Sequence, residues 1–483
     1  MKKIKILYIS HSALFAGGEI CLLTLLKNLD RSFFEPVVIF PTEGPFKKSV
    51  ENLSIKTYIS PLEWRVFTED GLFFSAVGLE ERVQRIVEII DQEQPDIIHS
   101  NTSVVWEGAL AARQRGVPHV WHLHEIMQGH PSLTSVLPLT LFYWAVDQLS
   151  ERVVVVSNAA KKKLDGLVPE NKIKVIYNGV ELTPDRNPSG CSLRDELGLP
   201  HDAILAVTVA TLARYKGIDT LLDAAARLKG RNDKLRFLLA GAGSQAAVTA
   251  LETKIEMLGL TGTFIYLGFR DDIHRILTEV DLLVVSSINE SFSLVTAEAM
   301  AAGKAVITTD CGGPTELVVN DETGFIVPIN NPEALAEKIL KLSTDSEVHE
   351  RLGMNGCKRW AGKFTVMTYA DSFQKLYQRT FTEEKQTPLS EKEDLLLKAF
   401  VEAYQAYVEK TRTIVSANEQ MANLNGLLTE IEKQLAERER QLADRDLQII
   451  DLKEHVGALL GSFSWKVTTP LRSVITLLSR YKR

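Results

Sequence analysis

The chain has 483 residues, of which 45% are hydrophobic and 24% are charged. These values are typical of water-soluble globular proteins, so they exclude wholesale disorder and a single small module, and the length suits about three domains. Because 62 Asp and Glu outnumber 55 Lys and Arg, giving a net charge of −7, the composition argues against a protein that coats nucleic acid.

The first 182 residues alternate short apolar runs with stretches of helical period. Apolar runs rich in β-branched residues stand at 4–10, 36–40, 96–100, 117–124 and 152–157, and helical patterns fall between them, as at Ile20–Leu29 and 106–115. This alternation predicts βα units on a parallel sheet. We therefore expect a Rossmann-like, doubly wound α/β domain over residues 1–182.

The same region bears on where the protein works. The N-terminus reaches Gly17 and Gly18 before a signal-type apolar core develops, and the charge-free run Ile126–Val146 is broken by two prolines. The first observation favours a mature cytoplasmic protein, and the second favours a buried helix over a membrane span. The four cysteines lie far apart without the spacing of a zinc site, so reduced thiols are expected.

A polar, turn-rich segment at 183–190 interrupts the pattern, and the alternation then restarts. Strand-like runs follow at 204–210, 235–241, 264–268, 281–287 and 305–310, with a helical stretch at 217–229. This pattern predicts a second Rossmann-like domain over residues 183–382, and we expect its last helix to return to the first domain.

The composition changes after residue 382. A polar linker is expected at 383–395, followed by a helical region at 396–460. With Met421 as position a of a heptad, ten of the twelve a and d positions in 421–459 are apolar, and the other two are arginines. The pattern favours a coiled coil that joins copies of the chain. The alternative is a helix that folds back on the body or pairs only partly.

Residues 461–483 form a basic tail. From residue 462 to 483 it carries five lysines and arginines, no acidic residue, and Trp465 among aliphatic side chains. Such a mixture is typical of segments that lie in an anionic membrane interface. This interpretation places a cytoplasmic protein at the inner face of the membrane; the alternative is a solvated tail with apolar contacts to the coiled coil.

The densest chemical signal lies in one loop and one helix of the second domain. Glu290 is predicted in a loop after a strand, and Glu298 in a helix that begins near Ser293. Ligands of open α/β sheets bind at the carboxyl ends of strands, where helix N-termini offer free N–H groups. A phosphate would suit the amides of Ser293 and Leu294, a ribose diol would suit Glu298, and a sugar hydroxyl would suit Glu290. The alternative is two solvated glutamates beside an ordinary helix.

This segment resembles the E-x7-E donor site of the retaining glycosyltransferases of family 4, which have the GT-B architecture of two facing Rossmann-like domains. The resemblance extends along most of residues 1–380, through LFAGGEICLLTLLKNL, VWHLHE, VVVSNAAKKKL, VIYNGVE and LLAGAGS. It implies that Glu290 contacts the transferred sugar and that Glu298 binds the nucleotide ribose. It also implies that His124 lies beside the sugar and that Glu316 makes donor-side contacts.

The resemblance further implies that Lys216 neutralises the donor diphosphate. Family members carry an arginine five residues before this lysine, but here the position holds Thr211. Arg214 is the candidate that could replace the missing charge; the alternative is an ordinary surface arginine. Gly17 and Gly18 would let the backbone approach the diphosphate, unless they serve only a turn.

The expected activity is transfer of a sugar from a nucleotide-sugar to an acceptor hydroxyl with retention of anomeric configuration. We expect neither a metal nor a cofactor, because the chain shows no Asp-x-Asp cluster for Mg²⁺ and Lys216 supplies positive charge instead. A glycan or lipid-linked acceptor in surface polysaccharide or glycoconjugate synthesis is expected, while the sugar and nucleotide stay open. The alternative is a non-catalytic scaffold that assembles partners through the coiled coil. Thr211 favours this idea, and the intact Lys216, His124, Glu290 and Glu298 oppose it.

Overall fold

The computed structural model describes residues 2–63, 66–68, 71–72, 78–130, 133–135, 138–181, 190–382, 391–461 and 472. The chain divides into two compact units, residues 1–396 and 397–483. The expected linker up to residue 390, and the basic tail apart from residues 461 and 472, lie outside the described residues.

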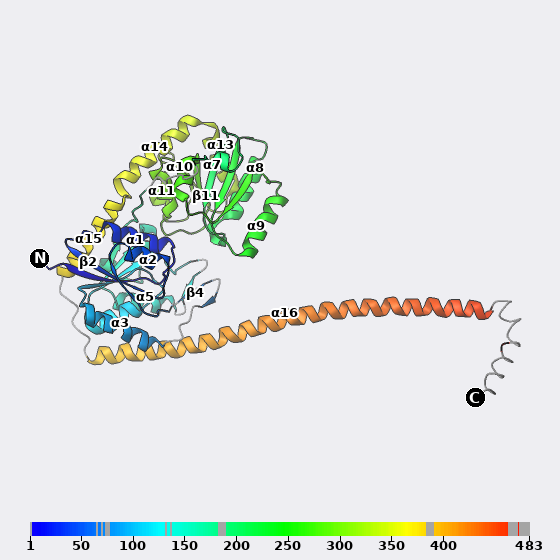
Figure 1. Ribbon diagram of the computed structural model, residues 1–483, viewed down its shortest axis with the longest axis horizontal. Helices are drawn as coiled ribbons and strands as arrows, with labels where there is room; N and C mark the ends of the chain where they lie inside the picture. Colours follow the sequence, from blue (N-terminus) through cyan, green and yellow to red (C-terminus); the bar gives the residue numbers. More distant parts are fainter. Residues whose placement is uncertain are drawn as a thin grey trace. The chain divides into compact units, whose positions relative to one another are not determined.

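The N-terminal half contains a seven-stranded parallel sheet. Its strands are β1 (Ile4–Ile9), β2 (Phe34–Phe40), β3 (Lys56–Ile59), β6 (Ile97–Ser100), β7 (His119–Leu123), β9 (Arg152–Val155) and β10 (Ile173–Val175), in the order β10-β9-β7-β6-β1-β2-β3. The connecting helices are α1 (Gly17–Asn28), α2 (Pro45–Glu51), α3 (Leu79–Glu93), α4 (Glu107–Arg115), α5 (Leu139–Gln148), α6 (Asn158–Lys162) and the 3-10 turn η1 (Glu170–Lys172) (Figure 1). A small antiparallel sheet joins β4 (Val66–Thr68) to β5 (Gly71–Leu72) and β8 (Thr134–Ser135).

A six-stranded parallel sheet forms the second domain. Its strands are β11 (Ile204–Val209), β12 (Leu235–Ala240), β13 (Phe264–Gly268), β14 (Leu282–Val285), β15 (Ala305–Thr309) and β16 (Phe325–Val327), in the order β13-β12-β11-β14-β15-β16. Around them lie α7 (Leu193–Glu196), η2 (Arg214–Lys216), α8 (Ile218–Leu228), α9 (Gln245–Met257), α10 (Ile273–Glu279), α11 (Leu294–Ala301), α12 (Pro314–Leu317), α13 (Pro332–Thr344) and α14 (Ser346–Lys363). The two doubly wound sheets confirm the expected α/β fold.

The last helix of this region, α15 (Val366–Thr382), carries the chain back to the first sheet. Its aromatic side chains Tyr369, Phe373 and Tyr377 are buried in the hydrophobic core that α1, β1 and β2 also form. The hydroxyl of Tyr377 also lies 2.7 Å from Nδ1 of His99 at the middle of the sheet. The first core is therefore completed by residues that follow the second domain in sequence.

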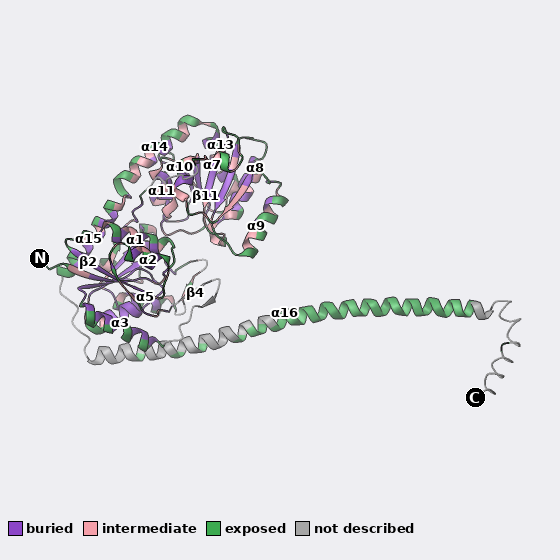
Figure 2. Cartoon of the chain, viewed as in Figure 1, coloured by how far each residue is buried: buried purple, intermediate pink, exposed green. Residues whose placement is uncertain are grey.

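Helix α16 (Glu391–Gly461) is a single helix of 71 residues, about 105 Å long at 1.5 Å per residue. The large apolar side chains of the heptad seam are exposed along it, from Met421 (60%) to Val456 (53%) (Figure 2). The long helix is thus present, and the coiled coil stays a prediction. Within the described ranges, each helix is either too short or too polar to cross a bilayer.

Candidate active site

The predicted site residues follow strands at which each sheet reverses its order. In the second domain η2 follows β11 and the loop with Glu290 follows β14, and these two strands are neighbours. In the first domain Gly17 and Gly18 follow β1, whose neighbour β6 is the strand where the order reverses. Such switch points open a crevice at the carboxyl edge of a parallel sheet, where ligands bind.

Lys216 and Glu290 meet at the second-domain switch point. The Lys216 Nζ donates to Oε1 of Glu290 at 2.5 Å, and the Ser287 hydroxyl donates to the same oxygen at 2.9 Å. Burial acts to lower the pKa of the Lys216 ammonium, but the charge of Glu290 offsets this, and the net pKa lies above its ordinary value. The site therefore holds a fixed cation next to a carboxylate.

The two loops that carry this pair also hold each other. The Ile288 amide donates to the Tyr215 carbonyl at 2.7 Å, and the Ser286 hydroxyl donates to the Lys216 carbonyl at 3.0 Å. Gly217 has φ 65°, and a Cβ at this position would lie 2.0 Å from the Ser286 carbonyl oxygen. Only glycine fits there, so the close approach of the loops depends on it.

The N-terminus of α11 lies beside this pair in sequence. Ser293 precedes the helix with φ 77° and ψ 88°, an uncommon conformation for a residue with a Cβ. Its hydroxyl bonds to that of Thr296 at 2.9 Å instead of capping a backbone N–H. The first amides of a helix have no acceptor within the helix, so those at Ser293 and Leu294 suit an anion.

Glu298 lies one turn further along α11 and is largely buried, with 14% of its side chain exposed. Its Oε1 is 3.8 Å from Nε2 of His274 on α10. The sequence reading missed His274, because one histidine within an amphipathic helix carries no signal by itself. The structure brings it to the carboxylate assigned to the ribose.

The two glycines that begin α1 lie close to residues of both domains. A Cβ at Gly17 would lie 3.7 Å from Cδ1 of Leu294, and a Cβ at Gly18 would lie 3.2 Å from Cδ2 of His124. The close approach of His124 is therefore a steric reason for glycine at position 18, since a side chain there would press on the imidazole. The structure thus brings Gly17, Gly18, His124 and Leu294 together.

His124 is oriented by Asn101, which follows β6 and was not predicted from the sequence. The Asn101 side-chain nitrogen donates to the Gly18 carbonyl at 2.9 Å, so its oxygen faces His124 and accepts from Nε2 at 3.0 Å. Nδ1 of His124 is then left as an acceptor. Burial lowers the pKa of His124 to about 3, so the ring is neutral near pH 7, as suits a positioning role.

The structure gives two other predicted residues, Arg214 and Glu316, different surroundings. Arg214 is exposed at the start of η2, and no hydrogen bond or ion pair holds it within the described part of the chain. Glu316 was expected on the donor side, but its carboxylate accepts from the amides of Asn158 and Ala159 at 2.9 and 2.6 Å and from the Tyr177 hydroxyl at 2.7 Å. Glu316 therefore caps α6 and ties the second domain to the first.

Glu19 is a fully buried carboxyl in the first turn of α1, with Oε1 3.2 Å from Nδ1 of His11. Burial raises the pKa of Glu19 to about 8 and lowers the pKa of His11 to about 4. The carboxyl therefore favours the folded state while protonated, and this contribution is lost as the pH rises from about 4.5 to 8. The buried histidine acts in the opposite sense, and only between about pH 4 and 6.5.

Replacing Glu19 with glutamine is therefore expected to make unfolding less sensitive to alkaline pH. Between pH 6.5 and 8 the free energy of unfolding of the variant should gain roughly 2 kcal/mol relative to the wild type, at 1.36 kcal/mol per pKa unit. Urea unfolding of both proteins at the two pH values measures this difference. If the difference in free energy of unfolding between variant and wild type is the same at both pH values, Glu19 is already ionised at pH 6.5.

Within the described residues, no group of His, Cys, Asp and Glu side chains has the arrangement of a metal site.

Family models match both domains: "Glycosyltransferase Family 4" over residues 15–183 and "Glycosyl transferases group 1" over residues 192–359. An uncharacterized glycosyltransferase of Methanocaldococcus jannaschii is 30% identical over 301 residues, which cover 60% of this chain and 77% of that protein. The N-acetyl-alpha-D-glucosaminyl L-malate synthase of Bacillus anthracis is 24% identical over 310 residues, 62% of this chain and 79% of that protein.

Solved structures agree with these matches. The structure of HepE from Anabaena with UDP and glucose has a TM-score of 0.67 and 26% identity, and covers 78% of this chain and 100% of its own. Another HepE structure, with UDP-glucose, has the same TM-score at 25% identity, and covers 78% of this chain and 99% of its own. Together with the two sheets, these likenesses confirm the GT-B architecture.

Proposed function

The chain belongs to the retaining glycosyltransferases of family 4, which use nucleotide-sugar donors, and we propose that it transfers a sugar from a UDP-sugar to a hydroxyl of a glycan or lipid-linked acceptor. The observation that carries the proposal is the Lys216–Glu290 pair, 2.5 Å apart at the switch point and followed by the free N-terminus of α11. The choice of uridine is supported by HepE, whose structures contain UDP and UDP-glucose.

Each proposed contact follows from the chemistry of the groups. The α11 amides and Lys216 hold the diphosphate, Glu298 accepts from the ribose diol, and Glu290 accepts from a hydroxyl of the transferred sugar. The acceptor oxygen attacks the anomeric carbon as its bond to the diphosphate breaks, and the acceptor proton passes to the leaving phosphate oxygen on the same face. Negative charge grows on that phosphate, so the ammonium stabilises the transition state more than the ground state.

The acceptor side of the site has carboxyl groups of its own. Glu125 directly follows His124 at the end of β7, is half-buried, and has its pKa raised to about 7 by burial. The charge of Glu125 adds to the effect of burial in raising the pKa of Glu19, so ionisation of one carboxyl disfavours ionisation of the other. We therefore favour an acceptor that presents neutral hydroxyls here, unlike the L-malate in the name of the Bacillus anthracis relative.

Thermal unfolding against a panel of UDP-, GDP-, ADP-, dTDP- and CMP-sugars, without added metal, tests the proposed function. A ligand that binds only the folded protein raises the midpoint, and at 100 times its Kd it adds about 2.7 kcal/mol of stability. We expect a selective shift with a UDP-sugar. If no donor in the panel shifts the midpoint, the non-catalytic scaffold becomes the better explanation.

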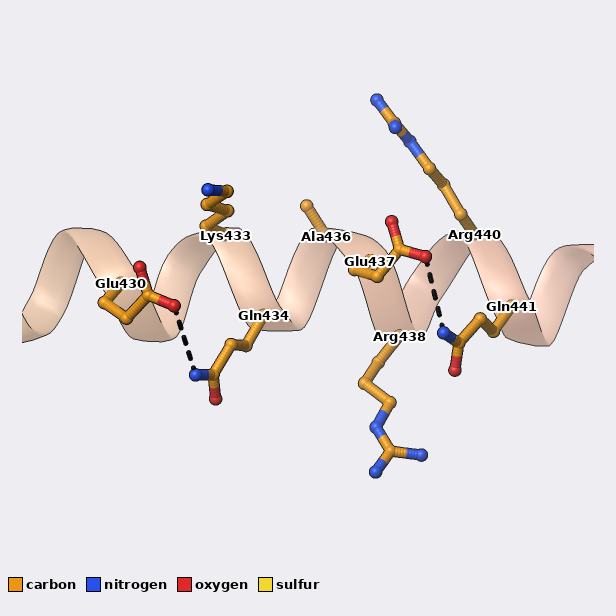
Figure 3. A pocket seen from close by; sticks show the side chains of 8 residues that line it. All are labelled: Glu430, Lys433, Gln434, Ala436, Glu437, Arg438, Arg440 and Gln441. Carbon is orange, nitrogen blue, oxygen red and sulfur yellow. Dashed lines mark hydrogen bonds between the residues drawn. The ribbon is translucent and has the colours of Figure 1, made fainter.

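We also propose that α16 pairs in parallel with a second copy of this chain. Its exposed seam is apolar except at d positions Arg438 and Arg445, and each arginine is followed at position e by an acid, Glu439 or Asp446. In a parallel, in-register pair, d and e side chains of opposite helices are neighbours, so these charges could pair across the seam. Figure 3 shows Arg438 projecting on the side of the helix opposite to Arg440, with Gln434 and Gln441 bonded along the helix to Glu430 and Glu437.

Changing Leu428 and Leu435 to aspartate is expected to abolish this pairing, because buried charges at two consecutive a positions oppose association. Sedimentation equilibrium of the full chain should give a dimer for the wild type and a monomer for the variant. Aspartates at Ala436 and Ala443, which lie at b positions outside the seam, form the matched control and should leave the dimer intact. A monomeric wild type would refute the proposal.

For the tail we propose binding to an anionic membrane surface, on the sequence evidence of five cations without an acid. Each cation near such a surface adds about 1 kcal/mol of attraction. Removing residues 462–483 is expected to abolish co-sedimentation with vesicles that contain phosphatidylserine. Equal binding to vesicles of phosphatidylcholine alone would show that charge is not what the tail recognises.

A further inference from the structure

The diphosphate site lacks one of its expected cations. The position five residues before Lys216 holds Thr211, which is exposed and uncharged. Arg214, the nearby candidate, is exposed as well and has no partner within the described ranges that would aim it at the site. A single ammonium would then face the two phosphates of the donor, and that ammonium is already paired with Glu290.

A second ammonium reaches this place from the other domain. Lys163 is the C-cap residue of α6 in the first domain, and its Nζ donates to the side-chain oxygen of Asn289 at 2.7 Å. Asn289 directly precedes Glu290, which binds Lys216. The two lysines therefore hold adjacent residues of one loop, one lysine from each domain.

His130 and Cys311 each interact electrostatically with both Lys163 and Lys216. Burial, together with the charges of Lys163 and Lys216, lowers the pKa of His130 to about 4. Cys311, in the loop after β15, also acts electrostatically on both lysines. Both ammoniums are therefore within electrostatic range of the same two side chains.

The two lysines differ in how their charge is balanced. Lys216 has the carboxylate of Glu290, and its pKa is raised overall. Lys163 is bonded only to a neutral amide, no carboxylate lies within ion-pair distance of it among the described residues, and burial lowers its pKa. A half-buried cation without a counter-ion is costly, so an anion is the natural complement of this place.

We propose that Lys163 replaces the absent arginine by binding the β-phosphate of the donor. This inference rests on the proposed function, since it assumes a nucleoside diphosphate in the second domain. Asn289 adjoins the residue assigned to the transferred sugar, and the phosphate that bears this sugar is the β-phosphate. Because the cation comes from the first domain, the full positive charge is assembled only where both domains contribute.

The test compares UDP with UMP, which lacks the β-phosphate, by calorimetric titration of the full chain without acceptor. For Lys163→Met we expect the Kd of UDP to rise about 10- to 100-fold, the effect of one charge-assisted hydrogen bond, while the Kd of UMP stays within about twofold. Lys163→Arg should retain most of the affinity for UDP. Lys162→Met, at the exposed neighbouring lysine, is the matched control and should bind UDP like the wild type.

A role of Lys163 as a mere link between the domains is tested with Asn289→Ala. This variant removes the same hydrogen bond but keeps the ammonium, so it should retain its affinity for UDP. Equal weakening by Asn289→Ala and Lys163→Met would overturn the proposal in favour of a structural link. A loss of UDP affinity in Arg214→Met but not in Lys163→Met would overturn it in favour of Arg214.

Three further outcomes distinguish a donor phosphate from an acceptor phosphate, and failure of this inference from failure of the proposed function. If Lys163→Met binds UDP normally but raises the KM of a phosphorylated acceptor, the lysine binds the acceptor and the proposal is wrong. If the wild type binds no nucleoside diphosphate, the proposed function fails together with this inference. If the wild type binds UDP and Lys163→Met binds it equally well without any acceptor effect, only this inference fails.

Discussion

Replacing Lys216 with methionine is expected to lower kcat by about 100- to 1,000-fold, the range seen when one preorganised donor to a developing anion is removed. The ammonium is held at 2.5 Å from Glu290 and is 18% exposed, so it is fixed before the reaction starts. Charge on the leaving diphosphate grows as the glycosidic bond breaks, and a fixed cation lowers the energy of that state most. Initial rates with saturating donor and acceptor measure the loss.

Two controls separate catalysis from folding in this experiment. Lys304→Met removes another partly buried lysine of the same domain, one that donates to the Thr278 carbonyl at 2.8 Å and lies outside the site. It should keep kcat within about twofold of the wild type, since its loss alters no contact to the donor. A second variant, Lys216→Met with Glu290→Gln, avoids a buried carboxylate without a partner, and its thermal midpoint, rather than its rate, checks that the site still folds. A kcat within fivefold of the wild type in Lys216→Met would refute the assigned role.

The strands could be predicted because parallel strands covered by helices on both faces are apolar along their whole length. The runs at 204–210 and 281–287 correspond to β11 (Ile204–Val209) and β14 (Leu282–Val285), with differences of one or two residues at the ends. Their order in the sheet then follows from short, right-handed connections. The loops of the site could be predicted for the same reason, because they follow directly after these apolar strands.

What the sequence could not provide are contacts between side chains far apart in the chain. Lys163 and Asn289 are 126 positions apart, and Glu316 reaches Asn158 over 158 positions. Each such contact joins a polar residue of one domain to a polar residue of the other, and polar residues in loops have no periodicity that would pair them. The contacts of Glu316 with Asn158 could not be predicted for this reason, because its motif gives its loop but not its partner.

The helix α16 shows a different limit. Its heptad pattern predicts a helix, because the period of the apolar residues is a local property of the sequence. The partner of the seam is not local, and the exposed leucines of a single chain leave it undetermined. Only a measurement of association in solution distinguishes a second copy from other partners. Sedimentation of the Leu428 and Leu435 variant, compared with its control outside the seam, is such a measurement.

Glu298→Ala is expected to raise the Kd of UDP by about 100-fold or more, since two hydrogen bonds from a ribose diol to a carboxylate contribute about 1.5–3 kcal/mol each. The Glu298 side chain is only 14% exposed in the wild type. In the alanine variant, water therefore reaches the ribose hydroxyls poorly and replaces the lost hydrogen bonds only in part. Glu256→Ala, at an exposed glutamate of α9, is the matched control and should bind UDP normally.

If Glu298 binds the ribose, it should also determine how strongly the protein prefers UDP over 2′-deoxy-UDP. The wild type should bind UDP at least about tenfold more tightly than 2′-deoxy-UDP, because the deoxy ligand lacks one of the two donors. The alanine variant has no carboxylate to detect the 2′-hydroxyl, so it should bind both ligands with similar Kd values. If the variant still prefers UDP by the wild-type factor, another group reads the ribose. A candidate is then His274, whose Nε2 lies 3.8 Å from the same carboxylate.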